Sequence, residues 1–310
     1  MLRSTLLWLS RRQTLMHVVA RRSLPRAFAR RFVAGETLDD AAAAVRAVNA
    51  RGMSATLDLL GECVTSTAEA DVARDQIVRI VDRIVAEGLN ANVSVKLTQL
   101  GLDLEYATCR ANLVAILERA VPHGVFVRVD MEGSPYTERT LRLFREDLHP
   151  RFGDLVGVVI QSMLRRSDHD LDELIRRGAR VRLVKGAYAE SHQIAFPDKR
   201  DVDAAFARQA VRLLDAGCYP AIATHDDRLI AAAKRHAREL GYGPERFEFQ
   251  MLYGVRRDLQ ERLRAEGYRV RVYIPFGNHW YPYLMRRLAE RPSNIAFITG
   301  SVIKEALARI

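Results

Sequence analysis

Residues 155–161 read Leu-Val-Gly-Val-Val-Ile-Gln, a short apolar run that ends on a polar amide. A run of this kind predicts a buried strand, and a helix-like segment follows it. Seven further runs share this pattern, at residues 54–60, 92–95, 125–129, 181–184, 221–224, 247–249 and 269–272. Strand–helix alternation indicates parallel pairing, and eight such units predict a closed (β/α)8 barrel of the TIM type, an α/β fold.

An open, doubly wound sheet is the alternative architecture for the same alternation. Such a sheet usually carries a Gly-x-Gly-x-x-Gly turn after its first strand to bind a dinucleotide. Here that place holds Gly61-Glu-Cys-Val, which favours the barrel. We expect residues 1–50 to form an N-terminal helical arm, including a helix at 37–50, and residues 51–310 to form the barrel.

Polar side chains stand where the predicted strands end. The eight residues are Glu62, Lys96, Asp130, Gln161, Lys185, His225, Gln250 and Tyr273. In barrels of this type the active site is built at the carboxyl ends of the strands. One solvated polar residue at a strand end is unremarkable, but eight on one rim predict a functional site.

A further polar stripe follows the eighth run, in Tyr283-Leu-Met-Arg-Arg-Leu-Ala-Glu290. Tyr283, Arg286, Arg287 and Glu290 are spaced to share one face of a helix, which Pro282 would begin. Two adjacent guanidiniums can bind one carboxylate or phosphate through paired hydrogen bonds. An isolated helix with this stripe is more often a solvated surface, but this one borders the predicted rim.

The positive charge of the chain is concentrated near the N-terminus. Residues 1–34 contain eight arginines and no acid, so subtracting them from the net charge of +10 leaves +2 for the remainder. A nucleic-acid-binding body is therefore disfavoured. The arm resembles helices that lie on an acidic membrane surface or pack on the body, and a mitochondrial presequence has a similar composition. No membrane-spanning run or secretory signal is expected, because Arg11-Arg12 interrupts the first apolar run.

Several chemistries are compatible with a cationic rim. Backbone N–H groups at Gly186 and Ala187 could hold a phosphate, and Lys96 or Lys185 could form a Schiff base as in an aldolase. One rim histidine among scattered carboxylates does not make a metal set. Three scattered cysteines indicate a reducing compartment, with thiols of structural or incidental role.

Six motifs, in order between residues 50 and 298, resemble the bacterial monofunctional proline dehydrogenase family. They are Val93-Ser-Val-Lys96-Leu-Thr-Gln-Leu-Gly, Val127-Arg-Val-Asp130-Met-Glu-Gly133, Arg182-Leu-Val-Lys-Gly-Ala-Tyr188, Ala223-Thr-His225-Asp, Gln250-Met-Leu-Tyr-Gly254 and Tyr273 with Tyr283-Leu-Met-Arg-Arg-Leu-Ala-Glu290. The resemblance implies a distorted barrel with non-covalently bound FAD. It also implies oxidation of L-proline to Δ1-pyrroline-5-carboxylate by hydride transfer from C5 to flavin N5, the first step of proline catabolism to glutamate. A membrane quinone would accept the electrons, at a cytoplasmic enzyme bound peripherally to the inner face of a bacterial cytoplasmic membrane.

The resemblance also implies roles for individual residues. Asp130 and Arg182 take the catalytic positions, Asp130 beside the substrate and Arg182 near the flavin N5 edge. The substrate-binding positions are Lys96, Leu252, Tyr273, Tyr283, Arg286 and Arg287. The flavin-contacting positions are Met131, Gln161, Arg182, Lys185, Gly186, Ala187, Thr224 and His225. Glu62 matches a gate position and Glu290 a supporting one, while Ala189 replaces a tryptophan found in some relatives.

Two other barrel enzymes remain as alternatives to this reading. A methylenetetrahydrofolate reductase would need a surface for folate and NAD(P)H instead of a double-arginine clamp. A Schiff-base aldolase would form a lysine adduct that borohydride traps, and neither it nor a nucleic-acid-binding module would be coloured by a flavin.

Overall fold

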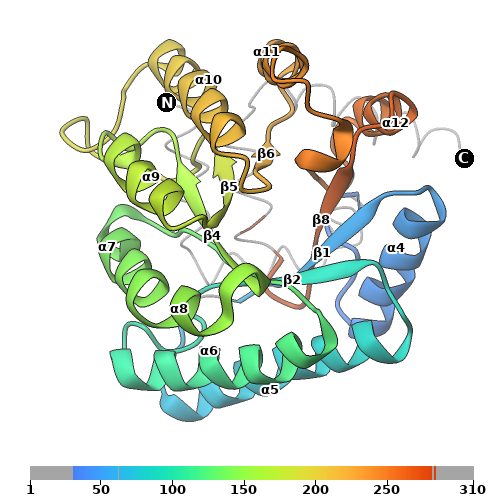
Figure 1. Cartoon of the computed structure of the whole chain (residues 1–310). Helices are drawn as coiled ribbons and strands as arrows, with labels where there is room; N and C mark the ends of the chain where they lie inside the picture. Colours follow the sequence, from blue (N-terminus) through green and yellow to red (C-terminus); the bar gives the residue numbers. More distant parts are fainter. Residues whose placement is uncertain (1–30, 62, 281–282, 284–310) are drawn as a thin grey trace, which may run out of the picture.

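Eight parallel strands form a closed barrel in the computed structural model, which describes residues 31–61, 63–280 and 283. Each strand pairs with its neighbours in sequence, and β8 closes the barrel onto β1 (Figure 1). The strands are β1 (Ser54–Leu59), β2 (Ala91–Val95), β3 (Val127–Val129), β4 (Val156–Gln161), β5 (Arg180–Val184), β6 (Ala221–Ala223), β7 (Glu248–Leu252) and β8 (Val270–Phe276). The predicted (β/α)8 fold is therefore confirmed.

Helices surround the barrel and connect successive strands (Figure 1). They are α4 (Leu38–Ala50), α5 (Thr67–Ala86), α6 (Tyr106–Ala120), α7 (Ser134–Leu143), α8 (His149–Phe152), α9 (Ser167–Arg176), α10 (Lys199–Ala216), α11 (Asp227–Glu239) and α12 (Arg257–Ala265). The helix predicted at 37–50 is α4, whose first turn is capped reciprocally by Thr37 and Asp40. At α5, the Ser66 hydroxyl accepts a hydrogen bond from the Glu69 N–H at 3.2 Å.

The segment before α4 is attached to the barrel by backbone hydrogen bonds. The Ala34 N–H donates to the Pro275 carbonyl at 2.9 Å, and the Gly277 N–H donates to the Gly35 carbonyl at 2.9 Å. Val45 of α4 is fully buried in the same apolar core that covers the outside of the strands. Residues 34–50 thus pack on the barrel wall, beside the ends of β8.

Two predicted strand boundaries are wrong. Tyr273 does not follow the eighth strand but lies within it, because β8 continues through Pro275 to Phe276. Proline is tolerated there because β7 pairs with β8 only as far as Leu252 and Tyr273, so no ladder hydrogen bond from the Pro275 nitrogen is lost. Gln250 likewise lies in the middle of β7 instead of at its end.

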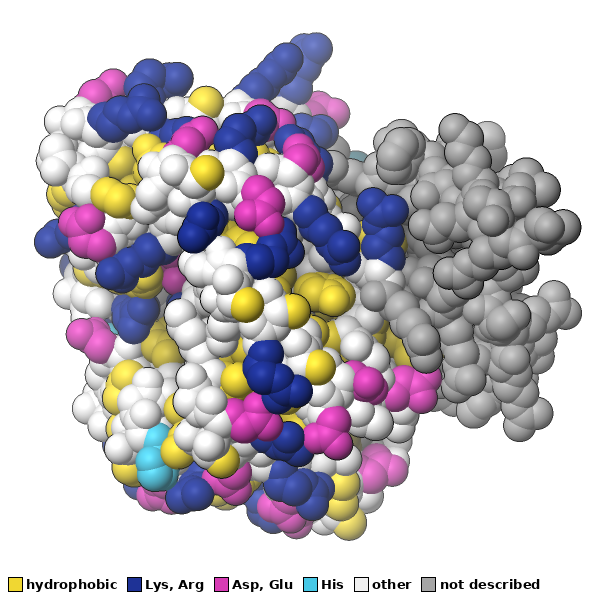
Figure 2. Space-filling view, turned by 90° about the vertical axis from the view of Figure 1, so that its right-hand side faces the viewer, with side chains coloured by type: hydrophobic (Ala, Val, Ile, Leu, Met, Phe, Trp, Pro, Cys, Tyr) yellow, Lys and Arg dark blue, Asp and Glu magenta, His cyan; other side chains and the backbone are white. Residues whose placement is uncertain are grey.

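The exterior carries both signs of charge. Figure 2 shows Lys and Arg side chains interspersed with Asp and Glu among the described residues of one face. Ion pairs join neighbouring helices, for example Arg119 of α6 with Asp82 of α5 at 2.5 Å. Within the described part of the chain, no helix has the length and apolar character needed to cross a membrane.

Candidate active site

Four charged side chains and one tyrosine, each in or directly after a different strand, meet inside the barrel. Residues at alternate positions of a strand point to the same face, so each strand sends every second side chain inward. The residues at the centre of the cluster are Asp58 of β1, Lys96 after β2, Asp130 after β3, Arg182 of β5 and Tyr273 of β8. All but the half-buried Tyr273 are almost completely buried, and contacts among the five side chains place them together.

Lys96 lies between two carboxylates. Its ammonium nitrogen is 2.6 Å from Oδ1 of Asp58 and 3.6 Å from Oδ2 of Asp130. Burial raises the pKa of Asp58 above its ordinary value, although the charge of Lys96 opposes this shift. The two lysine contacts therefore offset part of the cost of burying charge in the barrel.

Arg182 is the second cation of the cluster. Its Nη1 donates to Oδ1 of Asp130 at 2.7 Å, and its Nη2 donates to the Ser94 hydroxyl at 3.1 Å. The Tyr273 hydroxyl donates to the other Asp130 oxygen at 2.8 Å, and the guanidinium lies over the Tyr273 ring at 5.2 Å. Burial, reinforced by the Asp130 charge, raises the pKa of Tyr273 well above its ordinary value, so the phenol stays a donor at neutral pH.

A column of hydrogen bonds continues from Arg182 toward the other end of the barrel. The Arg182 Nε donates to the Gln250 side-chain oxygen, and the Gln250 amide donates to Glu248, both at 2.5 Å. Arg271 donates to both Glu248 oxygens at 2.9 and 3.1 Å. Burial alone would raise the pKa of Glu248, but the charge and hydrogen bond of Arg271 outweigh burial and lower it.

The positions expected to contact a flavin lie at four consecutive strand ends, from β3 to β6. Gln161 ends β4 and donates to the Glu132 carbonyl at 2.8 Å. His225 follows β6, and its Nε2 accepts from the Leu252 N–H at 2.9 Å, which places the ring proton of the neutral imidazole on Nδ1. Met131 and Thr224 are buried, and Lys185, Gly186 and Ala187 follow β5 directly. The structure thus brings the predicted set onto one arc of the rim.

Two details of this arc bear on ligand binding. Lys185 contacts carboxylates, with its nitrogen 2.6 Å from Asp203 and 3.1 Å from Asp226. Gly186 has φ +106°, and a Cβ there would lie 2.5 Å from the Met163 sulfur. A side chain at this position would strain the backbone and collide with Met163, so glycine fits the turn after β5 and the backbone there packs directly against Met163.

Of the remaining predicted site residues, the structure describes two. Leu252 is half-buried at the end of β7, and Tyr283 is buried at 6% exposure. Glu62, Arg286, Arg287 and Glu290 lie outside the described residues, and their positions stay predictions.

Sequence reasoning missed Asp58 and Ser94, which both face the cluster from inside the barrel. A signal was present, because an acid at the fifth position of the apolar run 54–60 is unusual in a buried strand. Thr56 and Asp58 share one face of β1, and Asn92, Ser94 and Lys96 share one face in and just beyond β2. This alternation indicates a polar barrel interior.

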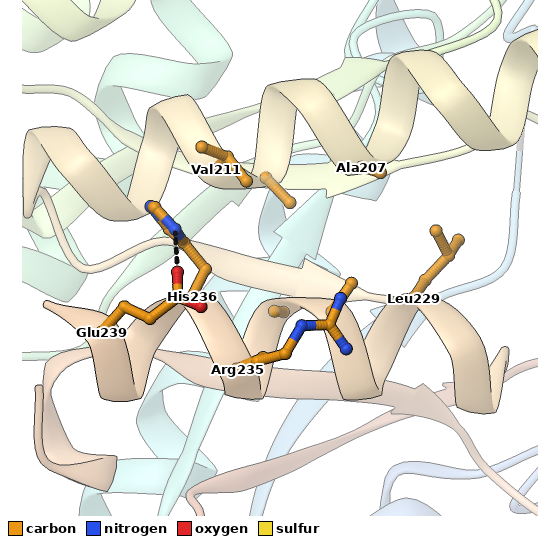
Figure 3. Close-up of a pocket in the computed structure, with 9 residues that line it drawn as sticks. Ala207, Val211, Leu229, Arg235, His236 and Glu239 are labelled. Atoms are coloured by element: carbon orange, nitrogen blue, oxygen red, sulfur yellow. Dashed lines mark ion pairs between the residues drawn. The ribbon is translucent and has the colours of Figure 1, made fainter.

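A separate groove lies outside the barrel, between α10 and α11 (Figure 3). Its volume is about 180 Å³, and four alanines line it together with Val211, Leu229, Arg235, His236 and Glu239. His236 at one end pairs with Glu239 at 3.4 Å and with Asp215 at 2.7 Å. None of the predicted site residues lines this groove.

The barrel and its buried charges define a class: a (β/α)8 barrel with a cluster of ion pairs at the carboxyl ends of its strands, where enzymes of this architecture build their sites. Comparison with known sequences is more specific. A family model described as Proline dehydrogenase matches residues 41–299. The chain belongs to the proline dehydrogenase family and is an enzyme that oxidises proline, which confirms the expected family.

Individual relatives agree over most of their length. The chain is 42% identical over 305 residues to Proline dehydrogenase 1 of Bacillus subtilis, covering 98% of this chain and 100% of the relative. It is 42% identical over 283 residues to Proline dehydrogenase of Deinococcus radiodurans, covering 89% of this chain and 90% of the relative. Neither the folate reductase nor the aldolase reading is supported by these matches.

A solved structure supports the architecture. Proline utilization A from Bdellovibrio bacteriovorus, inactivated by N-propargylglycine, superposes with a TM-score of 0.81 at 30% identity. The match covers 89% of this chain and 34% of that longer chain. The barrel of this chain therefore aligns with one part of the longer Bdellovibrio protein.

Proposed function

We propose that the chain oxidises L-proline to Δ1-pyrroline-5-carboxylate with non-covalently bound FAD and passes the electrons to a membrane quinone. The observation that carries this proposal is the buried cluster of Lys96, Arg182, Asp130 and Tyr273 inside the barrel, at the place where enzymes of this architecture build their sites. Membership of the proline dehydrogenase family supplies the substrate.

Substrate binding is assigned to the cationic side of the cluster. Lys96 presents a buried ammonium, and we assign Arg286 and Arg287 to the same carboxylate of proline. The ring walls are assigned to Tyr273, Tyr283 and Leu252. Fixing the carboxylate and the ring together would orient C5 of proline for a transfer that is effectively unimolecular.

Asp130 and Arg182 are assigned to the reacting end of the substrate. Asp130 accepts hydrogen bonds from both Arg182 and Tyr273, so its two oxygens fix the positions of a cation and a phenol. Arg182 is held in turn by Ser94 and Gln250, which leaves its guanidinium little freedom. A cation fixed in a buried site stabilises negative charge that develops during a reaction without having to reorganise.

The described residues fit a flavin along the arc from β3 to β6. Gly186 fixes the turn after β5 against Met163, and the neutral His225 ring carries its proton on Nδ1. Gln161 is held by the Glu132 carbonyl, so its side-chain amide has a fixed orientation. Met131, Lys185, Ala187 and Thr224 complete the assigned set. Bound there, FAD would accept the hydride from C5 of proline at its N5.

Association with the membrane is proposed for the N-terminal arm. The eight arginines of residues 1–34 give the arm a charge suited to an acidic membrane surface, whereas the body is nearly neutral. This arrangement would bring the enzyme close to a membrane quinone, on the inner face of a bacterial cytoplasmic membrane. We retain residues 1–50 as the arm and 51–310 as the catalytic barrel, with residues 34–50 packed on the barrel wall.

Product analysis tests the proposed reaction. The purified protein is incubated with L-proline and a soluble quinone, and both the reduced quinone and the cyclic imine product are quantified. Equimolar amounts of quinol and Δ1-pyrroline-5-carboxylate are expected. Quinone reduction without the imine, or imine formation only with a nicotinamide acceptor, would contradict the proposal.

A further inference from the structure

Lys96 is the cation of the cluster that depends most on a residue outside the predicted site. Among the described residues two carboxylates pair with it, and Asp58 is the closer, at 2.6 Å against 3.6 Å for Asp130. Asp130 is already engaged at both oxygens, by Arg182 and by Tyr273. Asp58 is therefore the nearest carboxylate partner of the Lys96 ammonium in the described part of the chain.

The physical need for such a partner follows from burial. Lys96 is 8% exposed, and burial favours the neutral form of an amine. A neutral amine would bind a carboxylate weakly, since charge-assisted hydrogen bonds are roughly twice as strong as neutral ones. The four-carbon stem of lysine is also flexible, so a fixed hydrogen-bond acceptor is needed to hold the nitrogen in one position.

Asp58 is well placed to direct Lys96, and the ammonium at 2.6 Å favours the charged form of its carboxylate against the effect of burial. It lies on β1, where it pairs in register with Ser94 of β2, two residues before Lys96. It is 1% exposed, so its carboxylate moves with the barrel wall and not with a loop. Within the residues that the structure describes, the charged or titratable groups near Lys96 include Asp58 from β1, Asp130 after β3, and beyond them Arg182 of β5 and Tyr273 of β8.

We propose that Asp58 is a positioning residue for the proline carboxylate: it holds Lys96 protonated and directed at the substrate. This inference rests on the proposed role of Lys96 in substrate binding. Asp58 acts through Lys96 and is not assigned any contact with proline.

The test uses the full-length enzyme as purified with its cofactor, and cyclopentanecarboxylate as a competitive inhibitor against proline. This probe keeps the ring and the carboxylate but has no amine, so alkaline changes in its Ki report groups of the protein. In Asp58→Asn, Ki is expected to rise about 10- to 100-fold, the range for one hydrogen bond to a charged group. The alkaline weakening of inhibition is expected to begin about one pH unit lower than in the wild type, because Lys96 loses its proton more easily.

Two further variants separate positioning from a purely structural role. Asp58→Glu keeps the charge but displaces the carboxylate, so Ki should rise at least about fivefold while the alkaline limb keeps its wild-type position. In a Lys96→Met background, Asp58→Asn should change Ki by less than about twofold, because the group through which it acts is gone. Asp170→Asn is the matched control: Asp170 is 2% exposed and pairs with Arg166 at 2.7 Å in α9, away from the cluster.

The outcomes distinguish this inference from the proposed function. If Lys96→Met leaves Ki unchanged, the substrate role of Lys96 itself is wrong, and the inference fails with it. If Lys96→Met weakens inhibition but Asp58→Asn keeps the wild-type Ki and alkaline limb, only the role of Asp58 is overturned. Should Asp58→Asn not fold, a wild-type Ki in Asp58→Glu overturns the inference.

Discussion

Replacement of Asp130 by asparagine is the most informative single change, because it preserves shape and removes one charge. The carboxylate accepts from Arg182 at 2.7 Å and from Tyr273 at 2.8 Å. Asparagine offers one acceptor oxygen, so one of these donors loses its partner and the other keeps only a neutral hydrogen bond. A hydrogen bond to a charged group contributes about 1.5–3 kcal/mol, and a neutral one about half of that. The expected loss of unfolding free energy is therefore about 2–4 kcal/mol.

Chemical denaturation measures the stability of Asp130→Asn, and steady-state kinetics with proline measure its activity. Because Asp130 holds both Tyr273 and Arg182, kcat/KM should fall by more than about tenfold even after saturation with cofactor. Asp170→Asn, which removes a buried carboxylate elsewhere, should lose stability while its kcat/KM stays within about twofold of the wild type. A loss of less than about 1 kcal/mol with unchanged kcat/KM in Asp130→Asn would refute this account of the cluster.

Three further predictions follow from the same features. Arg286→Met or Arg287→Met should weaken proline binding by about 2–4 kcal/mol, measured as a higher KM, with flavin content little changed. Loss of flavin with KM altered less than about threefold would contradict the assignment of the two arginines to the proline carboxylate. Deleting residues 1–30 should preserve turnover with a soluble acceptor but weaken binding to anionic vesicles by about 1 kcal/mol per basic residue; vesicle binding that is unchanged or insensitive to salt would contradict a membrane role. The raised pKa of Tyr273 predicts a contribution to folding stability that is fully present below the ordinary tyrosine value of about 10. This contribution is lost above that pH, because the phenol of the unfolded chain ionises first. Chemical denaturation of the wild type and Tyr273→Phe across that pH range measures the loss, and an equal alkaline loss in both proteins would argue against this prediction.

Much of the barrel could be predicted from residue order. Each apolar run coincides with an observed strand, and Lys96, Asp130 and Gln161 lie at the ends of β2, β3 and β4 as expected. Strand ends can be predicted from the sequence, because a polar residue that directly follows an apolar run is a feature of neighbouring residues alone. The end of β8 was missed since Pro275 normally argues against a strand, and only the early end of β7 makes it acceptable there.

The partners within the site could not be predicted, because they depend on how the barrel closes. Asp58 and Lys96 are 38 residues apart in sequence, and Asp130 and Tyr273 are 143 apart. Lys185 shows the same limit: its place after β5 was visible, but its pairing with Asp203 and Asp226 depends on where α10 and the N-cap of α11 lie. A strand pattern gives the inward direction of a side chain but not the identity of its neighbour across the barrel.

The visible spectrum of the purified protein, recorded without oxygen before and after addition of L-proline, tests the central claim most directly. We predict the absorbance of an oxidised flavin that denaturation releases from the chain, and its bleaching by proline in proportion to the bound cofactor. A colourless protein that still oxidises proline, or a bound flavin that proline leaves unbleached, would contradict the account.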